Sequence, residues 1–340
     1  MSHLLEINDL NVSFQTNGGE IHAVRGASFH VDRGEILAIV GESGCGKSVT
    51  AQAIMGMIPK PYGKIKNGKI LFKENELTKF SKKEFQKIRG SEIGMIFQDP
   101  MTSLNPTMKI GRQIDEVLIK NQNLSRNEAK QRTIELLNLV GIPDAFNRYS
   151  EYPHEFSGGM RQRVVIAMAL ACNPDLIIAD EPTTALDVTI QAQILDLLKK
   201  IQLEKNSSIM LITHDLGVVA EVADRVAVMY AGMVVESGTV HEIFESPKHP
   251  YTLGLLHSVP KLELSKKERL VPIEGAPPDL FSPPKGCPFA ARCPYTMEVC
   301  IEQIPEIETF TENHHARCWL NHPKMPKQKE LIAVGSENIV

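Results

Sequence analysis

Short apolar runs alternate with segments of helical period along the first three-quarters of the chain. Runs typical of strands lie at residues 4–14, 21–31, 35–40, 92–98, 175–181 and 208–215, and residues 225–238 have the pattern of a closing hairpin. Residues 47–58 and 110–140 are predicted to be helical, the latter because apolar side chains recur there at spacings of three and four. Strands that alternate with helices predict a mostly parallel α/β sheet.

The pattern changes near residue 258. Seven prolines fall between Val271 and Pro294, and proline is unfavourable in a helix interior and in a central strand. We therefore predict an α/β domain over residues 1–258 and a small, irregular extension over residues 259–340.

Net charge and hydropathy argue against a nucleic-acid-binding protein, a membrane-spanning protein and a secreted protein. The net charge is −4, so no overall positive field attracts nucleic acid. The longest apolar run, Val164–Cys172, is too short to span a bilayer, and residues 1–14 lack the basic and apolar regions of a signal peptide. We expect a cytosolic location, where thiols stay reduced and disulfides are disfavoured.

Residues 41–48, GESGCGKS, match the phosphate-binding pattern G-x-x-x-x-G-K-[ST] between a predicted strand and a predicted helix. Glycines let successive N–H groups surround phosphate, and the helix N-terminus adds positive potential. Lys47 would reach the β- and γ-phosphates of ATP, and Ser48 would ligate Mg²⁺. The expected nucleotide contacts are Gly41, Glu42, Ser43, Gly44, Cys45, Gly46, Lys47, Ser48 and Val49, with no chemistry assigned to the Cys45 thiol.

An acidic pair follows the apolar run at residues 176–179. Asp180 would lie beside the metal, and Glu181 would orient or deprotonate a water for attack on the γ-phosphate. The alternative is an exposed acidic turn. The phosphate-binding pattern upstream favours the catalytic interpretation.

The segment EFSGGMRQR, residues 155–163, resembles the L-S-G-G-Q signature of the ATP-binding subunits of ABC transporters. The signature positions are Ser157, Gly158, Gly159 and Met160, the last in place of glutamine. Further family motifs occur in the family's order over residues 4–258: Phe14 for adenine stacking, Gln98 in the Q-loop, Asp187 in the D-loop and His214 as the switch histidine. Ser157 is also predicted to cap the following helix.

The resemblance implies an ABC-type P-loop ATPase domain with an N-terminal antiparallel β subdomain and a helical subdomain inserted at about residues 99–153. It implies catalytic roles for Glu181, His214 and Gln98, with Ser48, Gln98 and Asp180 around Mg²⁺. In the family, the signature binds the γ-phosphate held by the opposite subunit. Two chains therefore enclose two ATP molecules.

Several longer segments, from GESGCGKSVTAQAIMG to GAPPDLFSPPKGCPFAARCP, resemble the ATPases of bacterial oligopeptide and dipeptide importers. This implies a peripheral location on the cytoplasmic face of the membrane. It also implies four partners: a second, different ATPase, two integral membrane permease subunits and an extracytoplasmic peptide-binding protein.

Three other functions share parts of the pattern, and the sequence argues against the second and the third. Importers of nickel or another small solute belong to the same group. Soluble ABC ATPases that act on DNA or ribosomes usually have a long coiled coil, a zinc hook or a second cassette, and none is found here. In a kinase, the signature and His214 would have no function.

Four of the six cysteines, Cys287, Cys293, Cys300 and Cys318, have the spacing C-x₅-C-x₆-C-x₁₇-C. Four thiolates can hold zinc or a [4Fe–4S] cluster, and this spacing matches neither common pattern. Prolines follow two of the cysteines, and the importer ATPases that the tail resembles hold such a cluster. We predict a structural [4Fe–4S] cluster; the alternatives are zinc, with His314 or His315 as a ligand, and unligated thiols.

Overall fold

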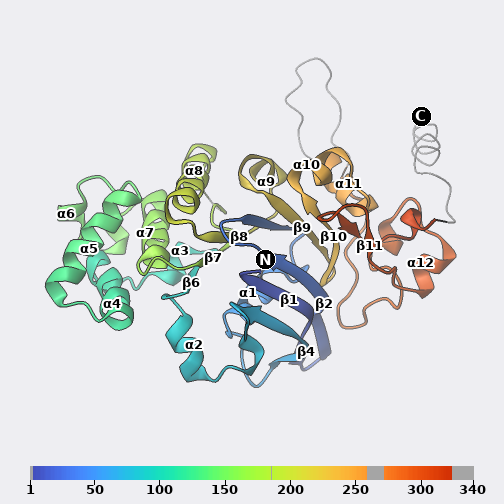
Figure 1. Cartoon of the computed structure of the whole chain (residues 1–340), viewed down its shortest axis with the longest axis horizontal. Helices are drawn as coiled ribbons and strands as arrows, with labels where there is room; N and C mark the ends of the chain where they lie inside the picture. Colours follow the sequence, from blue (N-terminus) through green and yellow to red (C-terminus); the bar gives the residue numbers. More distant parts are fainter. Residues whose placement is uncertain (1–2, 185, 259–271, 324–340) are drawn as a thin grey trace, which may run out of the picture.

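The computed structural model describes residues 3–184, 186–258 and 272–323, and a sheet of eight strands runs through these residues (Figure 1). In order across the sheet, the strands are β11 (Glu308–Thr309), β12 (His315–Ala316), β10 (Met233–Thr239), β9 (Arg225–Tyr230), β3 (Ile36–Val40), β8 (Ser208–Thr213), β7 (Leu176–Asp180) and β6 (Ile93–Ile96). The five strands from β9 to β6 are mutually parallel. The prediction of a mostly parallel α/β sheet is confirmed for this part.

The register of the parallel strands aligns their carboxyl ends. Val40 of β3 lies opposite Thr213 of β8, and Asp180 of β7 lies opposite Ile212. Every residue of β3, β7 and β8 is buried, as expected for strands covered on both faces. Residues that follow these strands therefore emerge together at one edge of the sheet.

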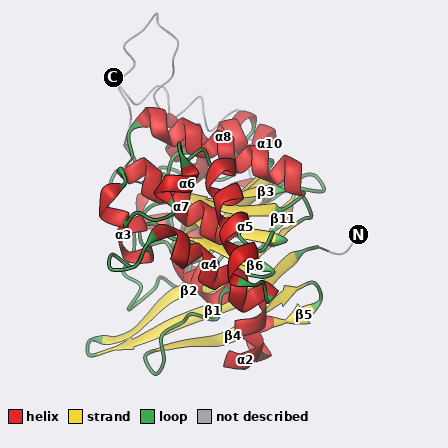
Figure 2. Cartoon of the chain, turned by 90° about the vertical axis from the view of Figure 1, so that its left-hand side faces the viewer, coloured by secondary structure: helices red, strands yellow, loops and turns green. Residues whose placement is uncertain are grey.

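A second sheet, antiparallel and ordered β2-β1-β4-β5, packs against the first (Figure 2). Its strands are β1 (Leu5–Thr16), β2 (Gly19–Val31), β4 (Gly63–Phe72) and β5 (Asn75–Glu76). The runs predicted at residues 4–14 and 21–31 correspond to β1 and β2, whose ends differ from the prediction by at most two residues. A register shift next to Asp9, whose φ is +48°, interrupts the alternation along β1 without ending the strand.

The segment between β6 and β7 is largely helical (Figure 1). It contains α3 (Pro100–Ser103), α4 (Ile110–Gln122), α5 (Arg126–Leu139) and α6 (Ala145–Arg148). The helical pattern over residues 110–140 belongs to two helices, because Asn123 adopts a left-handed conformation and Ser125 begins the second with a capping box. These helices lie within residues 99–153. The division into a subdomain stays a prediction, since one apolar core joins them to the sheet.

The other helices flank the sheets. They are α1 (Lys47–Ile54), α2 (Lys82–Ile88), α7 (Gly158–Leu170), α8 (Val188–Lys205), α9 (Leu216–Val222), α10 (Val240–Glu245), α11 (Pro250–His257) and α12 (Glu298–Glu302). The described part of the chain also has 3₁₀ turns at Leu77–Lys79, Pro153–Glu155, Ala290–Arg292 and Trp319–Asn321. Among the described residues, no helix has the length and apolar character that a bilayer crossing requires.

The described part of the C-terminal extension, residues 272–323, continues the main sheet. Strand β12 pairs with β10, where Ala316 lies opposite Glu236, and β11 pairs with β12. The boundary that we expect after residue 258 coincides with residues 259–271, which lie outside the described residues, as do residues 324–340. The extension as a separate domain stays a prediction.

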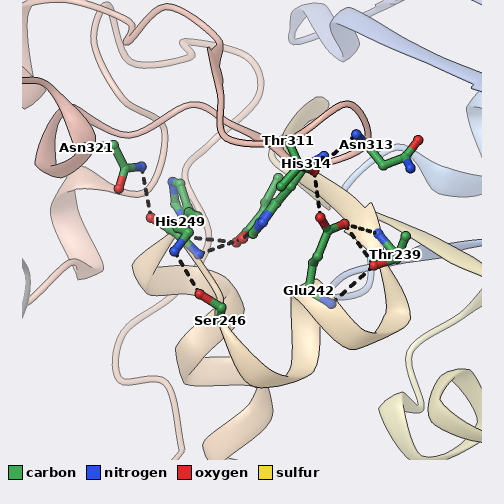
Figure 3. A network of polar contacts seen from close by, with 10 residues as sticks. Thr239, Glu242, Ser246, His249, Thr311, Asn313, His314 and Asn321 are labelled. Carbon is green, nitrogen blue, oxygen red and sulfur yellow. Dashed lines mark hydrogen bonds and ion pairs between the residues drawn. The ribbon is translucent and has the colours of Figure 1, made fainter.

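A buried polar network also holds this extension to the main sheet (Figure 3). The His314 ring lies 2.8 Å from a carboxylate oxygen of Glu236, and the two side chains are 3% and 0% exposed. Glu236 also accepts hydrogen bonds from the backbone N–H groups of Lys248 and His249. Removing the ring would leave buried carboxylate surface without one of its partners.

We predict that His314→Ala lowers the free energy of unfolding by about 1–3 kcal/mol, the cost of losing one partner of a buried polar group. His315→Ala is the matched control, because among the described residues the hydrogen bond of the His315 ring is to the exposed Thr309 hydroxyl and does not reach Glu236. Urea unfolding and the rate of proteolysis of the extension measure both. Equal effects of the two variants would contradict the anchoring role of His314.

Candidate functional site

The phosphate-binding pattern forms a loop between β3 and α1. Gly41, Gly44 and Gly46 have φ values of +153°, +78° and +99°, which favour glycine. A Cβ on Gly46 would lie 2.4 Å from the backbone oxygen of Ala23, so this position has no room for a side chain. Ser43 and Gly44 are exposed at the tip of the loop.

Lys47 lies beneath this loop with only 5% of its surface exposed. Its Nζ donates to the carbonyl oxygens of Gly41 at 2.8 Å and Glu42 at 3.0 Å. Burial raises the pKa of the neighbouring Cys45 thiol, and Val49 packs against the core below. The loop therefore presents backbone N–H groups and one ammonium group, an arrangement suited to phosphate.

Ser48 and Asp180 meet at the base of the loop. The Ser48 hydroxyl donates to Asp180 Oδ1 at 2.9 Å, which joins α1 to the end of β7. Burial raises the pKa of the Asp180 carboxyl. A hydroxyl and a carboxylate at this separation are hard oxygen donors of the kind that Mg²⁺ binds beside phosphates.

Glu181 is the centre of a second polar cluster. Its φ is +46°, and its N–H donates to the backbone oxygen of Ile212 at 2.9 Å. One carboxylate oxygen accepts hydrogen bonds from Gln98 and Thr184, each at 2.9 Å. The other lies 3.6 Å from His214 Nδ1.

The structure thus brings together three predicted residues, Gln98, Glu181 and His214. Each follows a parallel strand at the same edge of the sheet. The Glu181 side chain is 15% exposed and His214 is 61% exposed. Gln98 contacts Glu181, and no hydrogen bond among the described residues joins it to the Ser48–Asp180 pair, so its role at a metal stays a prediction.

The signature and the D-loop form two adjacent helix N-termini. Ser157 caps α7, accepting from the Met160 N–H at 3.3 Å, and Asp187 caps α8, accepting from the Ile190 N–H at 3.0 Å. A Cβ on Gly159 would lie 2.8 Å from the Ile190 side chain. Ser157, Gly158 and Asp187 are exposed, and no hydrogen bond in the described structure links them to residues 41–48. Ala185, within the D-loop, lies outside the described residues.

Phe14 lies on β1 opposite Gly63 of β4. Its ring is half-buried, and a Cβ on Gly63 would lie 2.8 Å from it. The ring packs against the core of the antiparallel sheet. Stacking of Phe14 on adenine stays a prediction.

Three contacts at this site are not predicted by the sequence patterns. Thr184 donates to Glu181, the Tyr251 hydroxyl accepts from the Glu42 N–H at 2.8 Å, and Arg292 pairs with the Glu42 carboxylate. Tyr251 and Arg292 are distant from the loop in sequence. No motif or periodicity indicates a contact of that kind.

Cys287 and Cys300 lie in a third apolar core, Cys293 packs against it, and Cys318 is also buried. Burial raises the pKa of Cys287 to about 11 and that of Cys318 to about 12, which favours neutral thiols. A tetrahedral zinc site with bonds of about 2.3 Å needs sulfur atoms about 4 Å apart. Within the described residues, only His3, His30 and Asp32 bring three potential ligand atoms within 4.8 Å of one another.

Comparison with protein families gives two matches. The family model described as ABC transporter matches residues 11–184. The model described as oligopeptide/dipeptide transporter, C-terminal region, matches residues 235–300. Together they include most of the described chain.

Individual proteins are similar over nearly the whole length. The oligopeptide transport ATP-binding protein OppD of Bacillus subtilis is 62% identical over 99% of this chain and 94% of its own. The dipeptide transport ATP-binding protein DppD of the same organism is 58% identical over 94% and 95%.

Two solved structures share the fold. The ATP-binding cassette MJ0796, in a dimeric post-hydrolysis state bound to ADP and Pi, has a TM-score of 0.63 and 28% identity over 69% of this chain and 98% of its own. CbiO1 of Clostridium perfringens, part of the transporter complex cbiONQ, has a TM-score of 0.62 and 32% identity over 72% and 92%.

These relatives correct one prediction. OppD and DppD are described as ATP-binding proteins of peptide transport, and nothing in those descriptions indicates an iron–sulfur cluster. The predicted [4Fe–4S] cluster is therefore wrong on this comparison. The error arose because cysteine spacing alone selects no ligand, and the choice of a cluster then rested on two prolines and on family resemblance. ATP and Mg²⁺ are the cofactors that the family supports.

We predict that Gly46→Ala abolishes binding of a fluorescent ATP analogue and lowers the melting temperature, because the new methyl would collide with the Ala23 carbonyl. Gly44→Ala is the control: its φ is also positive, but nothing lies within 4 Å of the new Cβ. It should show only the backbone cost of about 1–2 kcal/mol. Similar binding by both variants would contradict this packing argument.

Proposed function

This chain belongs to the ABC transporter family, and on that premise we propose that it is the ATP-hydrolysing subunit of an importer for oligopeptides or dipeptides. The observation that supports the substrate class is the 62% identity to OppD over 99% of the chain. The match of residues 235–300 to the peptide-transporter C-terminal region favours peptides over nickel or another small solute. We place the subunit peripherally, on the cytoplasmic face of the membrane.

One half of each nucleotide site lies on this chain. The N–H groups of residues 41–48 and the Lys47 ammonium would bind the β- and γ-phosphates. Ser48 and Asp180, whose oxygens lie 2.9 Å apart, would hold the metal. When bound with ATP, Mg²⁺ would neutralise the phosphate charge that develops during transfer.

Glu181 is the proposed general base. Glu181 directly follows Asp180 in the sequence. Its carboxylate is oriented by hydrogen bonds from Gln98 and Thr184. It would orient the attacking water and accept its proton. His214, 3.6 Å from Glu181, would contact the γ-phosphate side of the site.

The second half of the site would come from another subunit. Ser157 and Gly158 are exposed at the start of α7, and a helix N-terminus with free N–H groups binds anions. We propose that this end binds the γ-phosphate held by the phosphate loop of a second, different ATPase subunit. Two ATP molecules would then lie between two chains.

Closure of that pair would transmit force to the membrane. Gln98 lies between β6 and α3, so a change in its contact with Glu181 would move the helices at residues 99–153. We propose that these helices contact two integral permease subunits, which receive peptide from an extracytoplasmic binding protein. The peptide would contact the permease and the binding protein, and not this chain.

We predict that Glu181→Gln binds ATP, hydrolyses it at least about 100-fold more slowly, and accumulates as a closed ATPase pair, because an amide cannot accept the proton from water. Size-exclusion chromatography with MgATP, in the presence of the partner ATPase, measures the pair. Glu204→Gln, at an exposed position of α8, is the control. Turnover near the normal rate in Glu181→Gln would overturn the assignment.

We predict that Ser157→Arg abolishes ATP hydrolysis by the assembled transporter but leaves ATP binding to the isolated chain nearly unchanged. The bulky cation would block a surface that serves the opposite site. Leu203→Arg, on an exposed part of α8, should leave both properties intact. Loss of ATP binding by the isolated Ser157→Arg chain would contradict a site shared between subunits.

A further inference from the structure

The phosphate loop is held from outside by the C-terminal extension, through the side chain of Glu42. We propose that Arg292 is a positioning residue for ATP binding: it holds Glu42, and with it the first turn of the phosphate loop, in the shape that receives phosphate. This inference rests on the proposed function and adds a role for the extension.

The Arg292–Glu42 contact is a two-pronged ion pair. Nη1 of Arg292 lies 2.6 Å from one carboxylate oxygen of Glu42, and Nη2 lies 2.9 Å from the other. Paired parallel hydrogen bonds of this type fix the relative orientation of the two groups as well as their distance. The Arg292 side chain is 5% exposed and Glu42 is 27% exposed, so solvent screens the pair only partly.

The remaining N–H groups of Arg292 are also bonded. Nε donates to the Glu274 carbonyl at 2.9 Å, Nη2 to the Ile273 carbonyl at 3.1 Å, and Nη1 to the Tyr230 hydroxyl at 3.2 Å. A guanidinium has five N–H groups, and each of them has a partner here. The side chain is therefore fixed in one orientation.

Glu42 is in turn fixed at three points. Its carboxylate contacts Arg292, its N–H donates to the Tyr251 hydroxyl at 2.8 Å, and its carbonyl accepts from Lys47 Nζ at 3.0 Å. A direct chain of contacts thus leads from Arg292 through Glu42 to Lys47. A shift of Glu42 would move a carbonyl that holds the phosphate-binding lysine.

Aromatic packing holds Arg292 and its surroundings against the sheet. The Phe289 ring lies 5.2 Å from the Tyr230 ring and 5.4 Å from the Tyr251 ring. The Cys287 N–H donates to the Cys300 carbonyl at 2.7 Å, which closes the turn that includes Arg292. The packing of the extension therefore determines where the guanidinium lies.

Loss of the guanidinium would act on ATP in two ways that add. The loop would lose one of the three contacts at Glu42. The Glu42 carboxylate would also remain without its counter-charge, on a residue of the phosphate loop itself. Both changes weaken binding of a polyanion, and together they should raise the Kd for ATP about tenfold.

The test measures the Kd of a fluorescent ATP analogue for the full chain and its variants. Arg292→Gln should bind about tenfold more weakly, and Arg292→Lys, which keeps the charge but loses the two-pronged geometry, should be intermediate. Lys285→Gln removes a cation from an exposed position of the same extension and should bind normally. Normal ATP affinity in Arg292→Gln, with the extension loosened to protease, would overturn the inference and leave a purely structural tie.

The double variant separates positioning from general damage. In Glu42→Gln, no carboxylate is present that the loss of Arg292 could leave unpaired. Adding Arg292→Gln to Glu42→Gln should therefore weaken ATP binding by much less than tenfold. Full additivity of the two substitutions would contradict the direct contact. If Arg292→Gln does not fold, Arg292→Lys still decides the question: weaker ATP binding than wild type supports the inference, and normal ATP affinity overturns it. Wild-type protein that fails to bind the analogue would refute the proposed function itself, a result distinct from these.

Discussion

Parallel pairing of β3, β8, β7 and β6 is the constraint on which the rest of the structure depends. Because Val40 lies opposite Thr213 and Asp180 lies opposite Ile212, the residues that follow these strands emerge at one edge of the sheet. The phosphate loop, the acidic pair, Gln98 and His214 are distant in sequence, and the shared strand direction brings them together. A change of one strand's register would disperse them.

The phosphate loop is held on two sides of this edge. On the inner side, Ser48 bonds to Asp180 at the end of β7. On the outer side, Glu42 is held by Tyr251 and Arg292. The extension that provides Arg292 also adds β12 and β11 to the main sheet and buries His314 against Glu236. It is thus attached both to the sheet and to the nucleotide loop, which explains why an irregular, proline-rich segment is ordered there.

The local features of the site could be predicted from the sequence, and the distant contacts could not. The loop at residues 41–48, the strand-end pair Asp180–Glu181 and the helix cap at Ser157 each depend on a few consecutive residues, so a pattern reveals them. Contacts between Glu42 and Arg292, or Glu236 and His314, depend on how separate elements pack, and no period marks them. The cysteine spacing was compatible with several ligands, and family resemblance selected the wrong one.

The most direct test of this account is the structure of the assembled ATPase pair with MgATP bound. We predict that each γ-phosphate contacts Lys47 or its counterpart on one chain and Ser157 or its counterpart on the other, with the metal beside Ser48 and Asp180 and a water beside Glu181. Nucleotides held by one chain alone, with Ser157 facing solvent, would contradict the account.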